Sequence, residues 1–193
     1  MNENGKPGLV KSNTPRIAGM VLIGAGLLVL GVVALVALPR PDILASDELS
    51  AIPVEVDYPA PELNLNDLQG NPVSLADHLG QVVLVNNWAT WCPPCKAEMS
   101  ALQAYYRDYR EQGFTIIAID AGETKEDVDA FVISYNLTFP VWLDPTQVAT
   151  VVFRNPGLPS SYVIDREGGV RLAWTGAISH KMLEKYVTPL VEE

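Results

Sequence analysis

Two cysteines separated by two prolines are the residues of this sequence best suited to chemistry. Cys92 and Cys95 enclose Pro93 and Pro94. Side chains three residues apart lie on one face of a helical turn, close enough for the two sulfurs to form a disulfide. Because proline is tolerated in a helix only at its first turn, the spacing predicts a helix that starts at Pro93, with Cys92 beside its N-terminus. The pair is therefore expected to be a reversible redox centre.

The start of a helix favours the ionised form of the outer thiol. Unpaired N–H groups and the positive end of the helix dipole stabilise a thiolate, and cysteines in C-x-x-C motifs have pKa values of about 3.5–7.5 rather than about 8.5. Cys92 is therefore predicted to be the nucleophile, and the more buried Cys95 to resolve the mixed disulfide that Cys92 forms with a partner. The two intervening prolines remove two N–H donors, so we expect the pKa of Cys92 to fall less than it would with donors there.

The cysteines follow an apolar run that indicates a strand buried on both faces, residues 82–85. The next segment, residues 88–96, reads WATWCPPCK and resembles the active-site signature of thioredoxin-like proteins. It is similar in particular to the membrane-anchored TlpA/ResA-type thiol-disulfide oxidoreductases. The resemblance covers about residues 59–193, including segments 61–63, 70–75 and 158–165. It implies a thioredoxin-like fold with an N-terminal hairpin and a central strand–helix insertion at residues 120–144.

The hydrophobic pattern elsewhere agrees with that fold class. Strands alternate with helices before a final hairpin, which predicts a mixed α/β sheet with helices on both faces. The expected strands are residues 63–68, 73–75, 82–85, 114–119, 139–143, 160–164 and 169–175. The expected helices are residues 74–79, 93–112, 123–137, 146–153 and 179–191.

Glu98 is the candidate proton acceptor of this centre. It lies three residues beyond Cys95 and should face the same side of the helix. From the residues alone, the default is an exposed acid that complements the helix N-terminus. The family resemblance instead implies an active-site acid that takes the proton of Cys95 during resolution. Asn86 stands where thioredoxins carry a buried aspartate, which leaves Glu98 as the available acid.

A partner-binding surface is expected around the cysteines. The resemblance implies that the Leu158–Pro159 peptide bond is cis, opposite the C-x-x-C segment, although trans is the usual form of an X–Pro bond. Backbone beside Leu158 would then be open to pairing with a substrate. Trp91 is predicted to provide an apolar platform and, with Pro93 and Pro94, to contact the substrate. Trp88 is predicted to lie in the core.

Other polar residues are weaker candidates. Asn87 stands where the family pattern usually has phenylalanine, and an amide buried there needs hydrogen-bond partners. Glu123 follows a strand end, where open α/β sheets place their sites, so it is a candidate for partner choice. His78 and His180 are far apart in the sequence, and there is no second cysteine pair. We therefore expect no metal site, and no cofactor beyond the cysteines themselves.

The N-terminal part of the chain is predicted to anchor the domain. Residues 17–38 form an uncharged apolar stretch longer than the roughly 20 residues needed to cross a bilayer. A cleavable signal peptide is the alternative, but its apolar region is usually about 7–15 residues long. Basic residues concentrate in segment 1–16, which the positive-inside rule places in the cytoplasm. Residues 39–58 are predicted to be a linker, and residues 59–193 an extracytoplasmic domain.

The overall charge narrows the class of partner. The chain has 23 acidic and 13 basic residues, which argues against nucleic-acid binding. The resemblance implies reduction of disulfides in exported proteins, as in cytochrome c maturation, with electrons from an upstream membrane donor. Two alternatives remain: a thiol peroxidase of the peroxiredoxin-related superfamily, and a non-catalytic binding module that uses the surface around Trp91.

Overall fold

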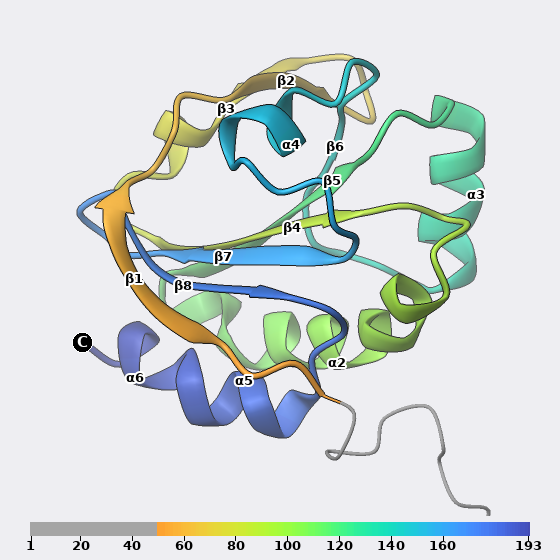
Figure 1. Ribbon diagram of the computed structural model, residues 1–193. Helices are drawn as coiled ribbons and strands as arrows, with labels where there is room; N and C mark the ends of the chain where they lie inside the picture. Colours follow the sequence, from red (N-terminus) through yellow and green to blue (C-terminus); the bar gives the residue numbers. More distant parts are fainter. Residues whose placement is uncertain (1–49) are drawn as a thin grey trace, which may run out of the picture. The chain divides into compact units, whose positions relative to one another are not determined.

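The computed structural model describes residues 50–193, which form one mixed sheet with helices on both faces (Figure 1). Eight strands are arranged in the order β1-β8-β7-β4-β5-β6-β2-β3. The strands are β1 (Val54–Pro59), β2 (Asn64–Asp67), β3 (Pro72–Ser74), β4 (Val82–Trp88), β5 (Phe114–Asp120), β6 (Val141–Leu143), β7 (Ser160–Ile164) and β8 (Gly169–Thr175). The predicted fold class is thus present in the described part of the chain.

β4 is the central strand and leads directly into the cysteine segment. It is parallel to β5 and antiparallel to β7, and all seven of its residues are buried. Because side chains alternate along a strand, Leu84 and Trp88 join one core cluster while Val83 and Val85 join the other. This two-sided burial explains why the sequence of β4 is a continuous apolar run.

Helices enclose the two cores. The cluster containing Leu84 is covered by α2 (Pro93–Tyr109), α3 (Lys125–Ser134) and α5 (His180–Tyr186). The cluster containing Val83 is covered by α4 (Val148–Val152) and the 3₁₀-helix η3 (Leu75–His78). A 3₁₀ turn, η4 (Arg110–Gln112), extends α2 before Gly113 ends it with a φ of 78°. The long α2 therefore begins at the cysteines and crosses beneath the sheet (Figure 1).

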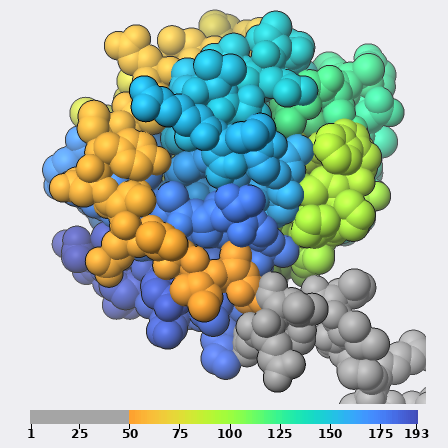
Figure 2. All heavy atoms as spheres, viewed as in Figure 1, coloured from red at the N-terminus to blue at the C-terminus, as the bar shows by residue number. Residues whose placement is uncertain are grey.

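The predicted linker is wrong at its C-terminal end. Residues 39–58 were expected to lack structure, but β1 starts at Val54 and pairs with β8 as an edge strand. Most of its side chains are exposed, and Figure 2 shows residues of β1 on the molecular surface. The sequence of β1, VEVDYP, does alternate apolar and polar residues, so the linker prediction overlooked a strand pattern that the sequence contains.

The three later helices are shorter than the hydrophobic pattern predicted, and α4 covers only residues 148–152 of the expected 146–153. The helix expected at residues 123–137 is α3, which starts after the N-cap Thr124. The helix expected at residues 179–191 is divided into α5 and α6 (Thr188–Val191). Pro189 explains the division, because proline lacks the N–H and clashes with the preceding turn.

The predicted membrane span at residues 17–38 and the segment 1–16 lie outside the described residues. Within residues 50–193, the structure contains no helix with the length and apolar character required to cross a bilayer.

Candidate active site

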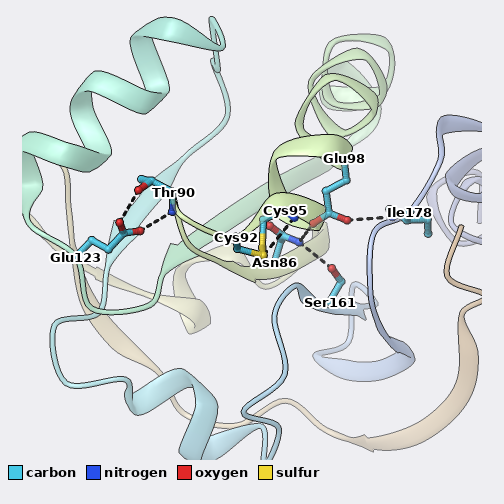
Figure 3. The surroundings of a disulfide bond; sticks show 8 residues. All are labelled: Asn86, Thr90, Cys92, Cys95, Glu98, Glu123, Ser161 and Ile178. Carbon is cyan, nitrogen blue, oxygen red and sulfur yellow. Dashed lines mark hydrogen bonds between the residues drawn. A yellow bond between two sulfur atoms is a disulfide. The ribbon is translucent and has the colours of Figure 1, made fainter. Parts of the chain in front are cut away.

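The two cysteines form a disulfide at the start of α2 (Figure 3). The sulfurs of Cys92 and Cys95 are bonded at 2.09 Å, and their Cα atoms are 5.3 Å apart. Cys92 is the N-cap residue and retains 3% exposure, whereas Cys95 is fully buried. The outer and inner positions predicted for the two thiols are therefore observed.

The backbone at the helix start is directed at the outer sulfur. Pro93 and Pro94 occupy the first positions of α2 and have no N–H to donate. The first available amide is that of Cys95, which donates to Sγ of Cys92 across 3.3 Å. One amide donor and the helix dipole thus act on this sulfur. This agrees with the prediction that the two prolines remove N–H donors from the helix start.

Glu98 is buried in the interior behind the disulfide, not exposed on the helix. It is 1% exposed, and its two carboxylate oxygens accept hydrogen bonds from Nδ2 of Asn86 at 2.8 Å and from the N–H of Ile178 at 3.1 Å. Burial raises the pKa of Glu98 to about 8, even though these two hydrogen bonds lower it. A carboxyl with this pKa exchanges a proton near neutral pH, which the surface alternative would not explain.

Asn86 connects Glu98 to the neighbouring strand, β7. Its Nδ2 also donates to Oγ of Ser161, 2.9 Å away on β7, while its Oδ1 has no hydrogen-bond partner among residues 50–193. A half-turn of the amide would place Oδ1 where a protonated Glu98 can donate to it. An aspartate at this position would add a second acid, whereas asparagine can serve either protonation state of Glu98.

The residues predicted to contact a partner are the segment with the Leu158–Pro159 bond and three residues next to the cysteines in the sequence. The Leu158–Pro159 bond is cis, and Ser160, the next residue, pairs with Asn87 at the end of β4. Leu158 packs against the core cluster that includes both cysteines. The side chain predicted to form the apolar platform, Trp91, is 65% exposed. The remaining predicted contact residues, Pro93 and Pro94, are also exposed, while Trp88 is in the core.

Asn87 is buried without the partners that its amide requires. It is 1% exposed, and within the described chain neither of its amide atoms has a hydrogen-bond partner. The Oγ of Ser160, on the paired residue of β7, is also unpartnered there. Asn87 therefore replaces the family's usual phenylalanine without gaining hydrogen bonds from the described residues.

We expect Asn87→Leu to stabilise the fold, because it removes buried polar atoms while keeping the side-chain size. Denaturant unfolding should show a gain of about 1–3 kcal/mol in the free energy of unfolding. Asn86→Leu is the matched control on the adjacent residue. It should decrease that free energy, since it breaks the hydrogen bonds to Glu98 and Ser161. A loss of stability in Asn87→Leu would contradict this interpretation.

Of the remaining candidates from the sequence, only Glu123 contacts the segment that leads to the cysteines. No described group of histidine, cysteine and acidic residues could hold a metal ion. His180 lies 3.8 Å from two acidic side chains on the surface, and His78 lies beside Trp142. Glu123, by contrast, contacts Thr90 in the segment that leads to the cysteines. No local motif indicated the contacts of Thr90, Ser161 or Ile178, since each depends on the folded topology.

Comparisons with known proteins agree with this geometry. The profile of the AhpC/TSA family matches residues 56–173. The thiol-disulfide oxidoreductase ResA of Geobacillus kaustophilus is 34% identical over 134 residues, which are 69% of this chain and 77% of that protein. ResA of Bacillus subtilis is 35% identical over 128 residues, covering 66% and 72% of the two chains. The crystal structure of a putative thiol:disulfide interchange protein DsbE from Chlorobium tepidum superimposes with a TM-score of 0.66 at 27% identity, covering 72% of this chain and 99% of that one.

Proposed function

This chain belongs to the AhpC/TSA family and is a thioredoxin-like thiol-disulfide oxidoreductase, and on that basis we propose that it reduces disulfide bonds in exported proteins. The observation that carries this proposal is the arrangement of Cys92, Cys95 and the buried Glu98 around the start of α2. Two thiols and an acid with a pKa near neutrality are the groups that a reversible disulfide exchange needs.

The reaction proceeds in two exchanges. The Cys92 thiolate attacks one sulfur of the partner disulfide, forms a mixed disulfide and releases the other partner sulfur as a thiolate. Glu98 then accepts the proton of the Cys95 thiol, and the resulting thiolate attacks Sγ of Cys92. The second partner sulfur leaves as a thiolate, so the partner gains two electrons and this protein becomes the observed disulfide. An upstream membrane thiol-disulfide donor returns the two electrons.

The proposed location follows from the N-terminal sequence. Residues 17–38 would tether the domain to the membrane, with segment 1–16 in the cytoplasm and the cysteines outside it. We propose a place in cytochrome c maturation, as the resemblance of the cysteine segment to TlpA/ResA-type proteins implies, where the partner disulfide would lie in a C-x-x-C-H haem-attachment segment. Labelling of Cys92 in intact cells by a membrane-impermeant maleimide supports this topology. Labelling only after cell lysis contradicts it.

The reduction potential of the Cys92–Cys95 pair tests the direction of electron flow. We expect a value near about −270 mV, typical of a reductant, when the full-length protein is equilibrated in detergent with a thiol buffer of known potential. A value near about −120 mV would make the protein a disulfide donor and contradict the proposal.

A thiol peroxidase is the second candidate, favoured by the AhpC/TSA match itself. In that case the Cys92 thiolate would attack a peroxide and be oxidised to a sulfenic acid. Peroxide-dependent turnover that persists in Cys95→Ser, with an external thiol as reductant, would favour this alternative. Binding of partners that persists after both cysteines are changed to serine would favour a binding module instead.

A further inference from the structure

The segment between β4 and α2 is fixed by an acid from the neighbouring loop. Both donors of Thr90 point at the Glu123 carboxylate: the backbone N–H donates to Oε2 and the hydroxyl donates to Oε1, each at 2.5 Å (Figure 3). Thr90 is two residues before Cys92, and the N–H of Cys92 in turn bonds to the carbonyl of Ala89 at 3.2 Å. Glu123 therefore holds the turn that presents the outer sulfur.

A second acid fixes Glu123. Asp120 ends β5, is fully buried, and accepts the N–H of Glu123 at its Oδ1 across 2.8 Å. Its Oδ2 is buried and has no hydrogen-bond partner within residues 50–193. Burial and the adjacent Glu123 carboxyl raise the pKa of Asp120.

The topology explains why this arrangement reaches the active site. β4 and β5 are parallel neighbours, with Trp88 and Asp120 paired at their carboxyl ends. The loops that follow the two strands therefore emerge side by side at one edge of the sheet. Glu123 bridges the two loops through Thr90. Both oxygens of its carboxylate accept hydrogen bonds from Thr90.

From this geometry we propose that Asp120 and Glu123 are positioning residues, which hold Thr90 so that Cys92 stays at the helix start in the reactive orientation. The proposal deepens the proposed function, since it rests on the same dithiol chemistry. It assigns to Glu123 a role different from that of Glu98, because Glu123 orients the nucleophile whereas Glu98 handles the proton of Cys95. A hydrogen bond to a charged group is stronger than one between neutral groups, so a carboxylate suits this clamp better than an amide.

The test compares Glu123→Gln with Glu126→Gln, in the reduced full-length protein in detergent. Glu126 lies in the first turn of α3 and is exposed, so both variants remove one negative charge from the same region. The readout is the rate at which Cys92 attacks a small aromatic disulfide, 5,5′-dithiobis(2-nitrobenzoate), which needs no protein-binding surface. We expect a decrease of about tenfold in Glu123→Gln, the effect of losing one hydrogen bond to a charged group. Glu126→Gln should stay within about twofold of the natural protein.

A double-variant cycle separates positioning from general stability. Thr90→Val removes the hydroxyl donor at nearly constant size and should slow the reaction by several fold. Combined with Glu123→Gln, it should add little, because both changes break the same clamp. Equal rates in the two Gln variants, additive effects in the cycle, or a lower melting temperature with an unchanged rate would each overturn the proposal. Failure of the natural protein to react would instead count against the proposed function.

Discussion

Cys95→Ser is expected to stop turnover after the first exchange and leave Cys92 covalently bound to its partner. Serine cannot attack the mixed disulfide, so the intermediate that the natural protein resolves should accumulate. Multiple-turnover reduction of an oxidised peptide should fall by at least about a thousandfold, the scale lost when a nucleophile is removed. Mass spectrometry under non-reducing conditions should show the protein mass increased by one peptide.

Cys92→Ser is the matched control for this trapping experiment. Its remaining thiol, Cys95, is fully buried one turn inside α2, so no adduct should form. Adduct formation on Cys95 at a rate similar to that on Cys92 would reverse the assignment of nucleophile and resolving cysteine.

Glu98→Gln is expected to slow resolution of the mixed disulfide without slowing its formation. General base catalysis contributes about 10²–10⁴-fold, so resolution at pH 7 should be at least about 100-fold slower. Because burial raises the pKa of Glu98 to about 8, resolution in the natural protein should accelerate up to about pH 8 and then level off. The variant should lose this dependence. Stopped-flow fluorescence or acid-quenched samples separate the two exchanges.

Stability provides an independent check on the same carboxyl. A folded-state pKa above the usual value means that the fold favours the protonated form, so ionisation destabilises it. The free energy of unfolding of the oxidised natural protein should therefore fall as the pH rises from about 4.5 to about 8. That contribution should be absent in Glu98→Gln. The same pH dependence in both proteins would show that Glu98 is not the group that titrates.

The sequence was most informative where local chemistry determines the structure. The β7–β8 hairpin has the predicted bounds, since its strands surround a turn, Asp165–Gly168, that ends with a glycine at a φ of 85°. The start of α2 was also predicted, because prolines can occupy only its first turn. The start of α2 positions the cysteines, and the hairpin contains the strand that follows the cis Leu158–Pro159 bond.

The parts that were missed depend on contacts between distant segments. The local sequence favoured an exposed Glu98. Its burial depends on a segment far along the chain, because its hydrogen-bond donor Ile178 lies 80 positions later. The capping of α3 by Thr124, whose hydroxyl accepts the N–H of Asp127, places Glu123 outside the helix. The expected helix start at residue 123 therefore concealed the contact between Glu123 and Thr90, which the parallel pairing of β4 with β5 creates.

The pH dependence of Cys92 alkylation tests the central claim that the start of α2 makes this sulfur an anion. In full-length Cys95→Ser, the rate of reaction with iodoacetamide follows the thiolate fraction of Cys92 alone. We predict a midpoint below about pH 7.5, within the range of cysteines activated by a helix start. A midpoint near about pH 8.5, the value of an ordinary thiol, would contradict the account.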